Sequence, residues 1–315
     1  MKTEFTFDDA CTQEAVGSVL YEEHLKRLSP SRLADFAGYL MPVWFSSIQE
    51  EHNAVRTCAG LFDCTHMGAV GFYGPHALHF INTVTTNNVE KLADGQAQYS
   101  YVLDPQGNIL DDIIVYRRSG EDFLCIVNAG NARKIKSYIH ALLADDLIED
   151  MDCPSTALTD KPIFKDLSDT LVDIALQGPV SLDILASITD QSPEALLTLK
   201  PFRFLEGSFR HIPCLVARTG YTGAKLGFEL LVSPKQAAAL WNVLLAEGES
   251  YGLRPCGLGA RDSLRIEAGL PLYGHELAGK YQISPFEAGY GWAVKLDKPF
   301  FIGKSAMQSA SNTQA

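Results

Sequence analysis

The clearest pattern of hydrophobic and polar positions lies between Gln96 and Tyr116. An apolar-rich run ends at Leu103, the turn Asp-Pro-Gln-Gly-Asn follows, and a β-branched run begins at Ile109. Apolar runs on both sides of a turn rich in Pro, Gly and Asn are typical of a β-hairpin. The pattern therefore predicts two antiparallel strands joined by a tight turn.

Two acidic residues, Asp111 and Asp112, interrupt the second strand of this hairpin. Side chains alternate between the faces of a strand, so the two carboxylates point to opposite sides. Both faces are otherwise mostly apolar, which predicts a strand covered on both sides, where a carboxylate needs a partner or a function. Two interpretations stay open: at least one acid is functional, or both belong to the turn and bind backbone donors.

A strand, a helix, further strands and a second helix follow one another twice along the chain. In both passes the first helix comes after a Gly-Pro pair, Gly74-Pro75 and Gly178-Pro179, which places proline in the first helical turn. The elements expected are strands and helices at 69–73, 76–84, 96–116, 123–128 and 131–143, and then at 171–177, 181–188, 210–218, 227–232 and 234–245. The order indicates an internal duplication with a ligand crevice between the halves; a coincidence of two Gly-Pro helix starts is the alternative.

The rest of the chain carries weaker signals. Arg261 and Arg265 are four residues apart on a predicted helix and therefore share a face. The other expectations are a short helix at 20–28, an irregular aromatic segment at 35–44, a helix at 46–56, a turn feeding a helix at 256–269 and a strand at 291–296.

These elements predict an α+β fold with three parts. The first is a lead-in, 1–30, and the second is a domain, 31–305, with two pseudo-repeated lobes at roughly 65–150 and 165–250. The third, 306–315, is a polar tail that we expect to be frayed at its end.

Composition narrows the classes of protein. Hydrophobic residues make up 46% of the 315 residues, which provides ample core. The net charge of -12, from 26 basic and 38 acidic residues, argues against nucleic acid or an anionic membrane as the main partner. Seven cysteines without a Cys-x-x-Cys pair indicate reduced thiols. With no signal-peptide pattern at Met1, we expect a cytoplasmic protein; an organellar location after removal of a transit peptide is the alternative.

Common cofactor motifs are absent from the sequence. Gly303-Lys304-Ser305 resembles the end of a P-loop, but Lys298 stands where the first glycine is required. His76 and His79 lie one helical turn apart without an evident third ligand, which favours ordinary surface histidines over a metal site. We therefore expect no metal.

The segment Arg218-Thr-Gly-Tyr-Thr-Gly223 is more informative. Its two glycines allow a sharp turn that holds Tyr221 at a loop tip, where it can stack on a flat ligand or simply pack. Beyond it Glu229 is an isolated acid on an apolar strand. A carboxylate suits the two parallel N–H donors of an aminopyrimidine edge; a plain salt bridge, for example to Arg218, is the alternative.

Together the motifs resemble the aminomethyltransferase, or T-protein, family of the glycine cleavage system. The resemblance runs in order from about residue 20 to residue 307. Its blocks are Asp35-Phe-Ala-Gly38, Met41-Pro42, Glu51-His52, Ala54-Val-Arg56, Gly60-Leu-Phe-Asp63, His66-Met-Gly68, Thr85-Thr-Asn87, Asp111-Asp112, Val127-Asn-Ala129, Gln177-Gly-Pro179, Arg218–Gly223, Cys256-Gly-Leu-Gly-Ala-Arg-Asp262 and Leu272-Tyr-Gly-His-Glu276.

The resemblance implies an activity. Tetrahydrofolate would be the cofactor, and the substrate would be an aminomethylated lipoyl arm delivered by the system's H-protein. Ammonia leaves, and the carbon reaches tetrahydrofolate as the methylene form. The fold expected is a duplicated folate-binding unit around a central crevice. We expect neither nucleic acid nor a membrane among the partners of the protein.

The resemblance also implies roles for single residues, and the first is catalytic. Asp112 matches the family's catalytic aspartate beside folate N5, where it would position or deprotonate that nitrogen. The cofactor-binding matches are Tyr99, Asn128, Tyr221, Glu229 and Arg261, of which Glu229 would hold the pterin edge. For Arg261, a folate contact and an ion pair with Asp262 or Glu267 are comparable alternatives.

The chain departs from the family in places. Family members continue into a small carboxyl-terminal β-barrel, whereas this chain ends at Ala315, so we expect that domain to be largely absent. The loop 223–227 replaces an acidic family segment, and Cys64-Thr65 stands where the family usually has Val-Ser. Two other functions stay open: a tetrahydrofolate-dependent demethylase of a small molecule, and a non-catalytic folate-binding regulator.

Overall fold

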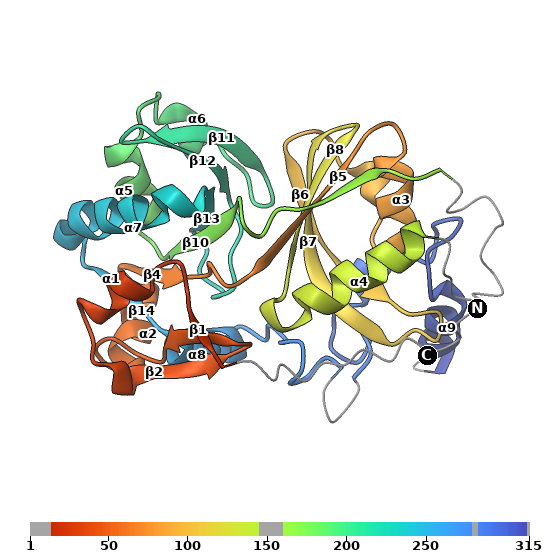
Figure 1. The fold of residues 1–315 in the computed structure, drawn as a ribbon, viewed down its shortest axis with the longest axis horizontal. Coiled ribbons are helices and arrows are strands. Elements are labelled where there is room, and N and C mark those ends of the chain that lie inside the picture. Colours follow the sequence, from red (N-terminus) through yellow and green to blue (C-terminus); the bar gives the residue numbers. More distant parts are fainter. Residues whose placement is uncertain (1–13, 145–159, 279–282, 314–315) are drawn as a thin grey trace. The chain divides into compact units, whose positions relative to one another are not determined.

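The structure is a computed structural model that describes residues 14–144, 160–278 and 283–313 (Figure 1). It is a mixed α/β protein with several sheets. The chain divides into two compact units. The first contains Gly68–Leu167 and Pro271–Ala315, and the second contains Cys11–Met67 and Ser168–Leu270.

The first unit is built on a five-stranded antiparallel sheet with the order β6-β7-β8-β5-β9. Its elements are β5 (Gly68–Tyr73), α3 (Ala77–Val84), β6 (Gln96–Leu103), β7 (Ile109–Ser119), β8 (Asp122–Val127), α4 (Ala132–Leu143), β9 (Ile163–Asp166) and α9 (Lys304–Thr313). The predicted hairpin is confirmed as β6 and β7, which pair over their full length.

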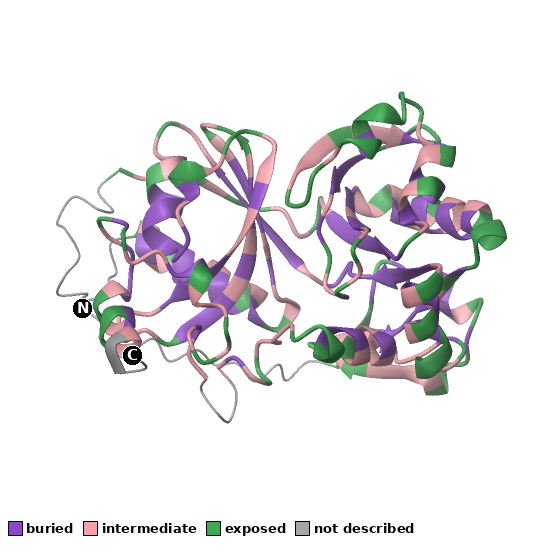
Figure 2. Ribbon diagram, turned by 180° about the vertical axis from the view of Figure 1, so that it is seen from behind, coloured by how far each residue is buried: buried purple, intermediate pink, exposed green. Residues whose placement is uncertain are grey.

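Both faces of this sheet are covered. Helices α3 and α4 contribute Phe80 and Ile139 to one core, where they pack with Ile113 and Val115 of β7. The opposite face carries Tyr101 and Leu103 of β6 and is covered by apolar residues of the 277–307 segment. Figure 2 shows the resulting burial of the strands. The two acids of β7 therefore point into two different environments.

The second unit contains a six-stranded sheet with the order β11-β12-β13-β10-β4-β14, antiparallel except for the parallel pair β4 and β14. Its strands are β4 (Ala59–Asp63), β10 (Val172–Gln177), β11 (Phe204–Phe209), β12 (Ile212–Ala217), β13 (Gly227–Val232) and β14 (Leu253–Cys256). A smaller sheet pairs β1 (Val16–Gly17), β3 (Tyr39–Pro42) and β2 (Leu33–Phe36). The helices are α1 (Tyr21–Leu25), α2 (Ile48–Thr57), α5 (Ser181–Ile188), α6 (Glu194–Leu197), α7 (Pro234–Gly248) and α8 (Leu258–Glu267).

Alternation along the strands of the six-stranded sheet separates two faces. Ile174 of β10 and Leu230 of β13 face a core shared with α5 and α7. Ala175 and Phe62 face the other side, where they pack against Ala260 of α8. Glu229 lies opposite Ala175 in the register and so belongs to the side of α8.

Two expectations about local structure were wrong. The aromatic segment 35–44 is ordered as the hairpin β2 and β3, which pairs Phe36 with Tyr39 around Ala37 and Gly38. The strand expected at 291–296 is a 3-10 turn, Gly291–Ala293. The helix expected at 20–28 is present but shorter, at Tyr21–Leu25. Lys304–Thr313, which includes much of the polar tail, forms α9.

The two Gly-Pro helix starts give a matched pair for a stability test. Both Gly74 and Gly178 have positive φ, at 97° and 134°. A Cβ on Gly178 would lie 2.5 Å from the Cys58 carbonyl oxygen, whereas a Cβ on Gly74 would meet nothing within 4 Å. We expect Gly178→Ala to cost about 2–4 kcal/mol through strain and overlap together, as measured by urea unfolding.

Gly74→Ala is the control, because it carries the backbone strain without the overlap. It should cost about 1–2 kcal/mol. Equal losses from the two substitutions would show that the close approach at Gly178 is of no consequence.

Candidate active site

The two acids of β7 are both within the strand, so the interpretation that they belong to the turn is wrong. Asp111 is fully buried. Its carboxylate accepts hydrogen bonds from the Asn128 amide N (3.1 Å), Asn128 Nδ2 (2.8 Å) and Asn131 Nδ2 (2.6 Å). The 3-10 turn Ala129–Asn131, between β8 and α4, brings both asparagines to the acid. Asp111 is thus held by neutral donors from one side.

Asp112 is half-buried on the other face of β7. Tyr99 Oη donates to Asp112 Oδ2 at 2.9 Å, and Asn128 Nδ2 lies 2.8 Å from Asp112 Oδ1. Because Tyr99 lies on β6 and Asn128 directly follows β8, the strands on either side of β7 each supply one donor. The structure brings Tyr99, Asp112 and Asn128 together.

Electrostatics favour the protonated forms of this acid pair. Burial, and then the charge of Asp112, raise the pKa of Asp111 to about 7. Burial likewise raises the pKa of Asp112 to about 6, against the hydrogen bonds from Tyr99 and Asn128. Within the described part of the chain no lysine, arginine or histidine lies in ion-pair distance of either carboxylate. The pair therefore exchanges a proton near neutral pH without a fixed counter-cation.

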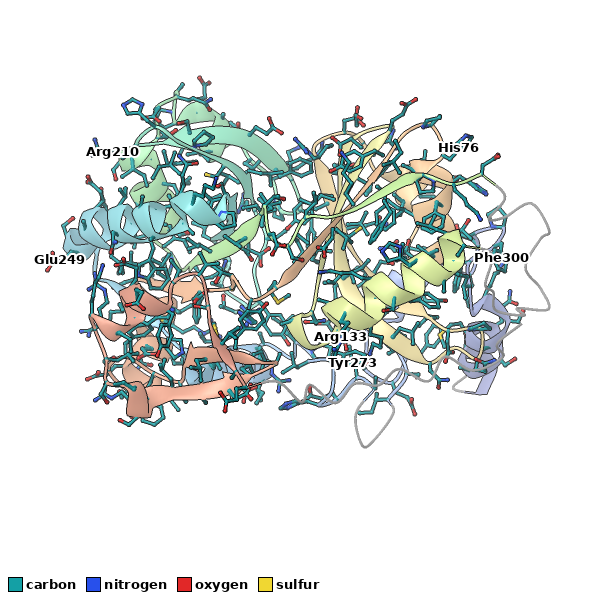
Figure 3. The ribbon with its side chains drawn as sticks, in the orientation of Figure 1. His76, Arg133, Arg210, Glu249, Tyr273 and Phe300 are labelled. Carbon is teal, nitrogen blue, oxygen red and sulfur yellow. The ribbon has the colours of Figure 1, made fainter. Side chains whose placement is uncertain are left out.

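Aromatic rings cluster around Tyr99, the donor to Asp112. Tyr99 contacts Tyr101 edge-on, with centroids 5.2 Å apart. It also contacts Tyr290 at 5.7 Å and Trp292 at 5.8 Å, and these two rings are 5.8 Å from each other. Tyr273, which is labelled in Figure 3, accepts a hydrogen bond at its Oη from Lys134 Nζ of α4 at 2.6 Å.

In the second unit the loop that carries Tyr221 is held by Gln177, at the end of β10. Gln177 Nε2 donates to the Thr219 carbonyl oxygen (3.2 Å), and Thr222 Oγ1 donates to Gln177 Oε1 (3.0 Å). A Cβ on Gly220 would lie 2.0 Å from Gln177 Oε1. Any larger residue at this position would displace the Gln177 amide, so glycine is favoured where the loop passes over it.

Glu229 lies half-buried on β13 and accepts a hydrogen bond from Thr219 Oγ1. The alternative partner, Arg218, instead donates its Nη1 to the Leu199 carbonyl oxygen at 2.7 Å. The salt bridge between Glu229 and Arg218 is thus not formed. Glu229 is instead hydrogen-bonded to the Thr219 hydroxyl, next to the loop that carries Tyr221.

Arg261, on α8, lies with its guanidinium 4.8 Å from the centroid of the Tyr221 ring. Its Nη1 contacts Cys64 Sγ at 3.4 Å, and the charges of Glu229 and Asp173 help raise the pKa of Arg261. The ion-pair alternatives were wrong, since Asp262 pairs with Arg265 and Glu267 pairs with Arg56 and His52. Tyr221, Glu229 and Arg261 therefore form a second group, in the second unit.

Sequence reasoning missed several residues of these two groups. Asn131 holds Asp111, and Tyr290 and Trp292 contact Tyr99. No spacing in the sequence singles these three out. Asp173 is different, because it is an isolated acid on the apolar strand β10, the signal that identified Glu229. It is buried, and burial together with the Glu229 charge raises its pKa well above the usual value.

The described residues contain no cluster of three or more His, Cys, Asp or Glu side chains arranged to hold a metal ion. In the same part of the chain no helix has the length and apolar character of a membrane span.

The sequence matches a family model described as the GCVT N-terminal domain over residues 21–298. The chain belongs to this family. The expectation from the sequence motifs is thereby confirmed, and the site described above is that of a member of the GCVT family.

Similar proteins agree with this assignment. The aminomethyltransferase of Shouchella clausii is 45% identical over 280 residues, which cover 88% of this chain and 71% of that protein. The aminomethyltransferase of Halalkalibacterium halodurans is 42% identical over 92% of this chain and 72% of its own length. The crystal structure of the glycine cleavage system aminomethyltransferase T from Bartonella henselae has a TM-score of 0.79 at 31% identity, covering 95% of this chain and 76% of that one.

Proposed function

We propose that this chain transfers the aminomethyl carbon from the lipoyl arm of an H-protein to tetrahydrofolate. Ammonia and 5,10-methylenetetrahydrofolate are the products. The family and the aminomethyltransferase relatives support a folate-dependent transferase. The observation that carries the proposal to the site is the half-buried Asp112 carboxylate, held by Tyr99 and Asn128 and free of a counter-cation among the described residues.

Asp112 is the catalytic base of the proposal. A carboxylate in a partly desolvated site with a pKa of about 6 is ionised at neutral pH and basic enough to accept a proton. Tetrahydrofolate, when bound, supplies a nitrogen nucleophile for the one-carbon unit. Asp112 Oδ1 or Oδ2 would take the proton of that nitrogen, and the bonds from Tyr99 and Asn128 would fix its orientation.

The second group fits the flat end of the folate. The Glu229 carboxylate can accept the two parallel N–H groups of the pterin edge. Tyr221 offers a ring to stack on, and Arg261, lying over that ring, offers donors to a ring carbonyl. We assign these three residues, with Tyr99 and Asn128, to folate binding.

We further propose that the two units descend from a duplicated element, with lobes at roughly 65–150 and 165–250. The strand orders β6-β7-β8-β5 and β11-β12-β13-β10 are the same, and every neighbouring pair is antiparallel. In each unit a Gly-Pro pair leads from the first strand into a helix, and a second helix follows the fourth strand. The shared strand order and helix positions therefore support the proposed duplication more strongly than the two Gly-Pro pairs do alone.

A steady-state assay tests the function. The chain is mixed with aminomethyl-loaded H-protein and tetrahydrofolate, and ammonia and methylenetetrahydrofolate are measured with each substrate omitted in turn. Equal amounts of the two products, formed only with both substrates present, are expected. Product from a free methylated amine, and none from the loaded H-protein, would replace the proposal with a small-molecule demethylase.

The pH dependence of turnover and of stability should have opposite signs. Turnover needs ionised Asp112, so kcat/KM should fall as pH drops through about 6–7, the range of the acid pair. Stability should instead fall as pH rises from about 4 to about 7, because the folded pair keeps protons that the unfolded chain releases. Rate profiles and urea unfolding over this range measure both effects.

The variant Asp111→Asn sharpens this test. Without the neighbouring charge, the acid limb of the rate profile should move to lower pH. A limb that stays in place would show that the titration belongs to another group.

A further inference from the structure

Tyr99, Tyr290 and Trp292 form a three-ring group, which we call the aromatic cup. Their centroids are separated by 5.7, 5.8 and 5.8 Å, and the ring planes are tilted by 58°, 40° and 41°. A small group resting on this triangle lies within about 6 Å of all three centroids, the range of cation–π attraction. Trp292 is 51% exposed, so one side of the cup is open.

The cup adjoins the acid that lacks a counter-cation. Tyr99 Oη donates to Asp112, and the Asp112 charge contributes, after burial, to raising the pKa of Tyr290. The Tyr99 hydroxyl and the Asn128 side-chain amide donate to the carboxylate, but no basic group among the described residues neutralises it. A half-buried carboxylate that is hydrogen-bonded to one member of a three-ring group is an environment suited to a positive ligand.

We propose that the aromatic cup binds the protonated amino group of the aminomethyl donor against the Asp112 carboxylate. This inference rests on the proposed function and adds a site for the donor to the residues assigned to folate. The donor ends in a primary amine on a thioether carbon, which is cationic when protonated. Its amino group would meet the charge of Asp112 and the π density of the three rings at once, and an uncharged group would lack the attraction between opposite charges.

Binding of the H-protein in two states tests the inference without turnover. The affinity of the chain is measured by calorimetry for aminomethyl-loaded H-protein and for the unloaded dihydrolipoyl form, in the absence of folate. We expect the wild type to prefer the loaded form about 10- to 30-fold. The preference should appear as pH rises through about 6, because Asp112 must be ionised.

Three variants separate the contributions. Trp292→Leu removes a π face and should lower the preference about 3- to 10-fold, whereas Trp292→Phe keeps a face and should lower it less. Asp112→Asn should abolish the preference and its pH dependence. Phe202→Leu, at a 42% exposed aromatic residue of the second unit, is the matched control and should match the wild type.

A second measurement separates π density from shape. Site-specific replacement of Trp292 by difluorotryptophan withdraws π density at nearly constant size and should weaken the preference, with unchanged tetrahydrofolate affinity. A wild-type preference in Trp292→Leu would overturn the inference. So would a loss of tetrahydrofolate affinity with the preference intact, since the ring would then stack on folate. Turnover of the wild type is measured separately. Turnover without a preference for the loaded form would contradict the aromatic cup alone, whereas no turnover would contradict the proposed function.

Discussion

Asp112→Asn should lower kcat by about 10²- to 10⁴-fold and leave the fold and most of the tetrahydrofolate affinity intact. The substitution keeps the size of the side chain and one acceptor oxygen for Tyr99 or Asn128. It removes the basic oxygen that takes the proton. Single-turnover kinetics, with binding of tetrahydrofolate measured in parallel, separates these effects.

Asp111→Asn is the matched comparison one residue away. All three donors to Asp111 are N–H groups of Asn128 and Asn131, so an asparagine would set an NH₂ group against at least one of them. We expect a loss of about 1–3 kcal/mol in stability and a smaller loss of kcat than in Asp112→Asn. Equal losses of kcat in the two variants would contradict the assignment of the acids to different faces and roles.

Glu229→Gln should raise the dissociation constant of tetrahydrofolate by about 10- to 100-fold, the value of a hydrogen bond to a charged group. A carboxylate accepts two parallel N–H groups, whereas glutamine offers one acceptor and sets a donor against the other. The Thr219 hydroxyl also donates to Glu229, so this position needs an acceptor rather than the NH₂ group of glutamine. Titration calorimetry with tetrahydrofolate measures the change.

Glu206→Gln on β11 is the control, since Glu206 is an exposed acid of the same sheet. It should bind tetrahydrofolate as the wild type does. If Glu229→Gln keeps the wild-type dissociation constant, Glu229 does not bind tetrahydrofolate. The folate group in the second unit would then consist of Arg261 and Tyr221 alone.

The sequence predicted those parts of the fold in which periodicity and turn chemistry act together. The hairpin of β6 and β7 has alternating apolar residues on both sides of a Pro-Gly-Asn turn, and the strand β13 and helix α5 have the expected bounds. The hairpin β2 and β3 was missed because its turn uses Ala37 at a positive φ, an uncommon conformation for alanine. The run 291–296 has the composition of a strand, but the 3-10 turn of Gly291 begins there instead.

The residues of the site likewise divide into those that the local sequence reveals and those that only tertiary packing brings together. Acids on apolar strands are visible in a sequence, which is why the pair Asp111-Asp112 and the isolated Glu229 were singled out and Asp173 could have been. The choice of Asp112 for catalysis came from the family resemblance. Tyr290 and Trp292 were not found, because they lie far along the chain from Tyr99 and only tertiary packing brings the three rings together. The ion pairs of Asp262 and Glu267 depend on the helix faces of α2 and α8, which spacing alone could not assign.

One labelling measurement tests the central claim most directly. H-protein is loaded with an aminomethyl group that carries ¹³C and ¹⁵N, and one equivalent is mixed with the chain and tetrahydrofolate. The account predicts that ¹³C appears in 5,10-methylenetetrahydrofolate and ¹⁵N in ammonia in equal amounts, and that Asp112→Asn slows both together. Label that stays on the H-protein while tetrahydrofolate binds, or ¹³C released without tetrahydrofolate, would contradict it.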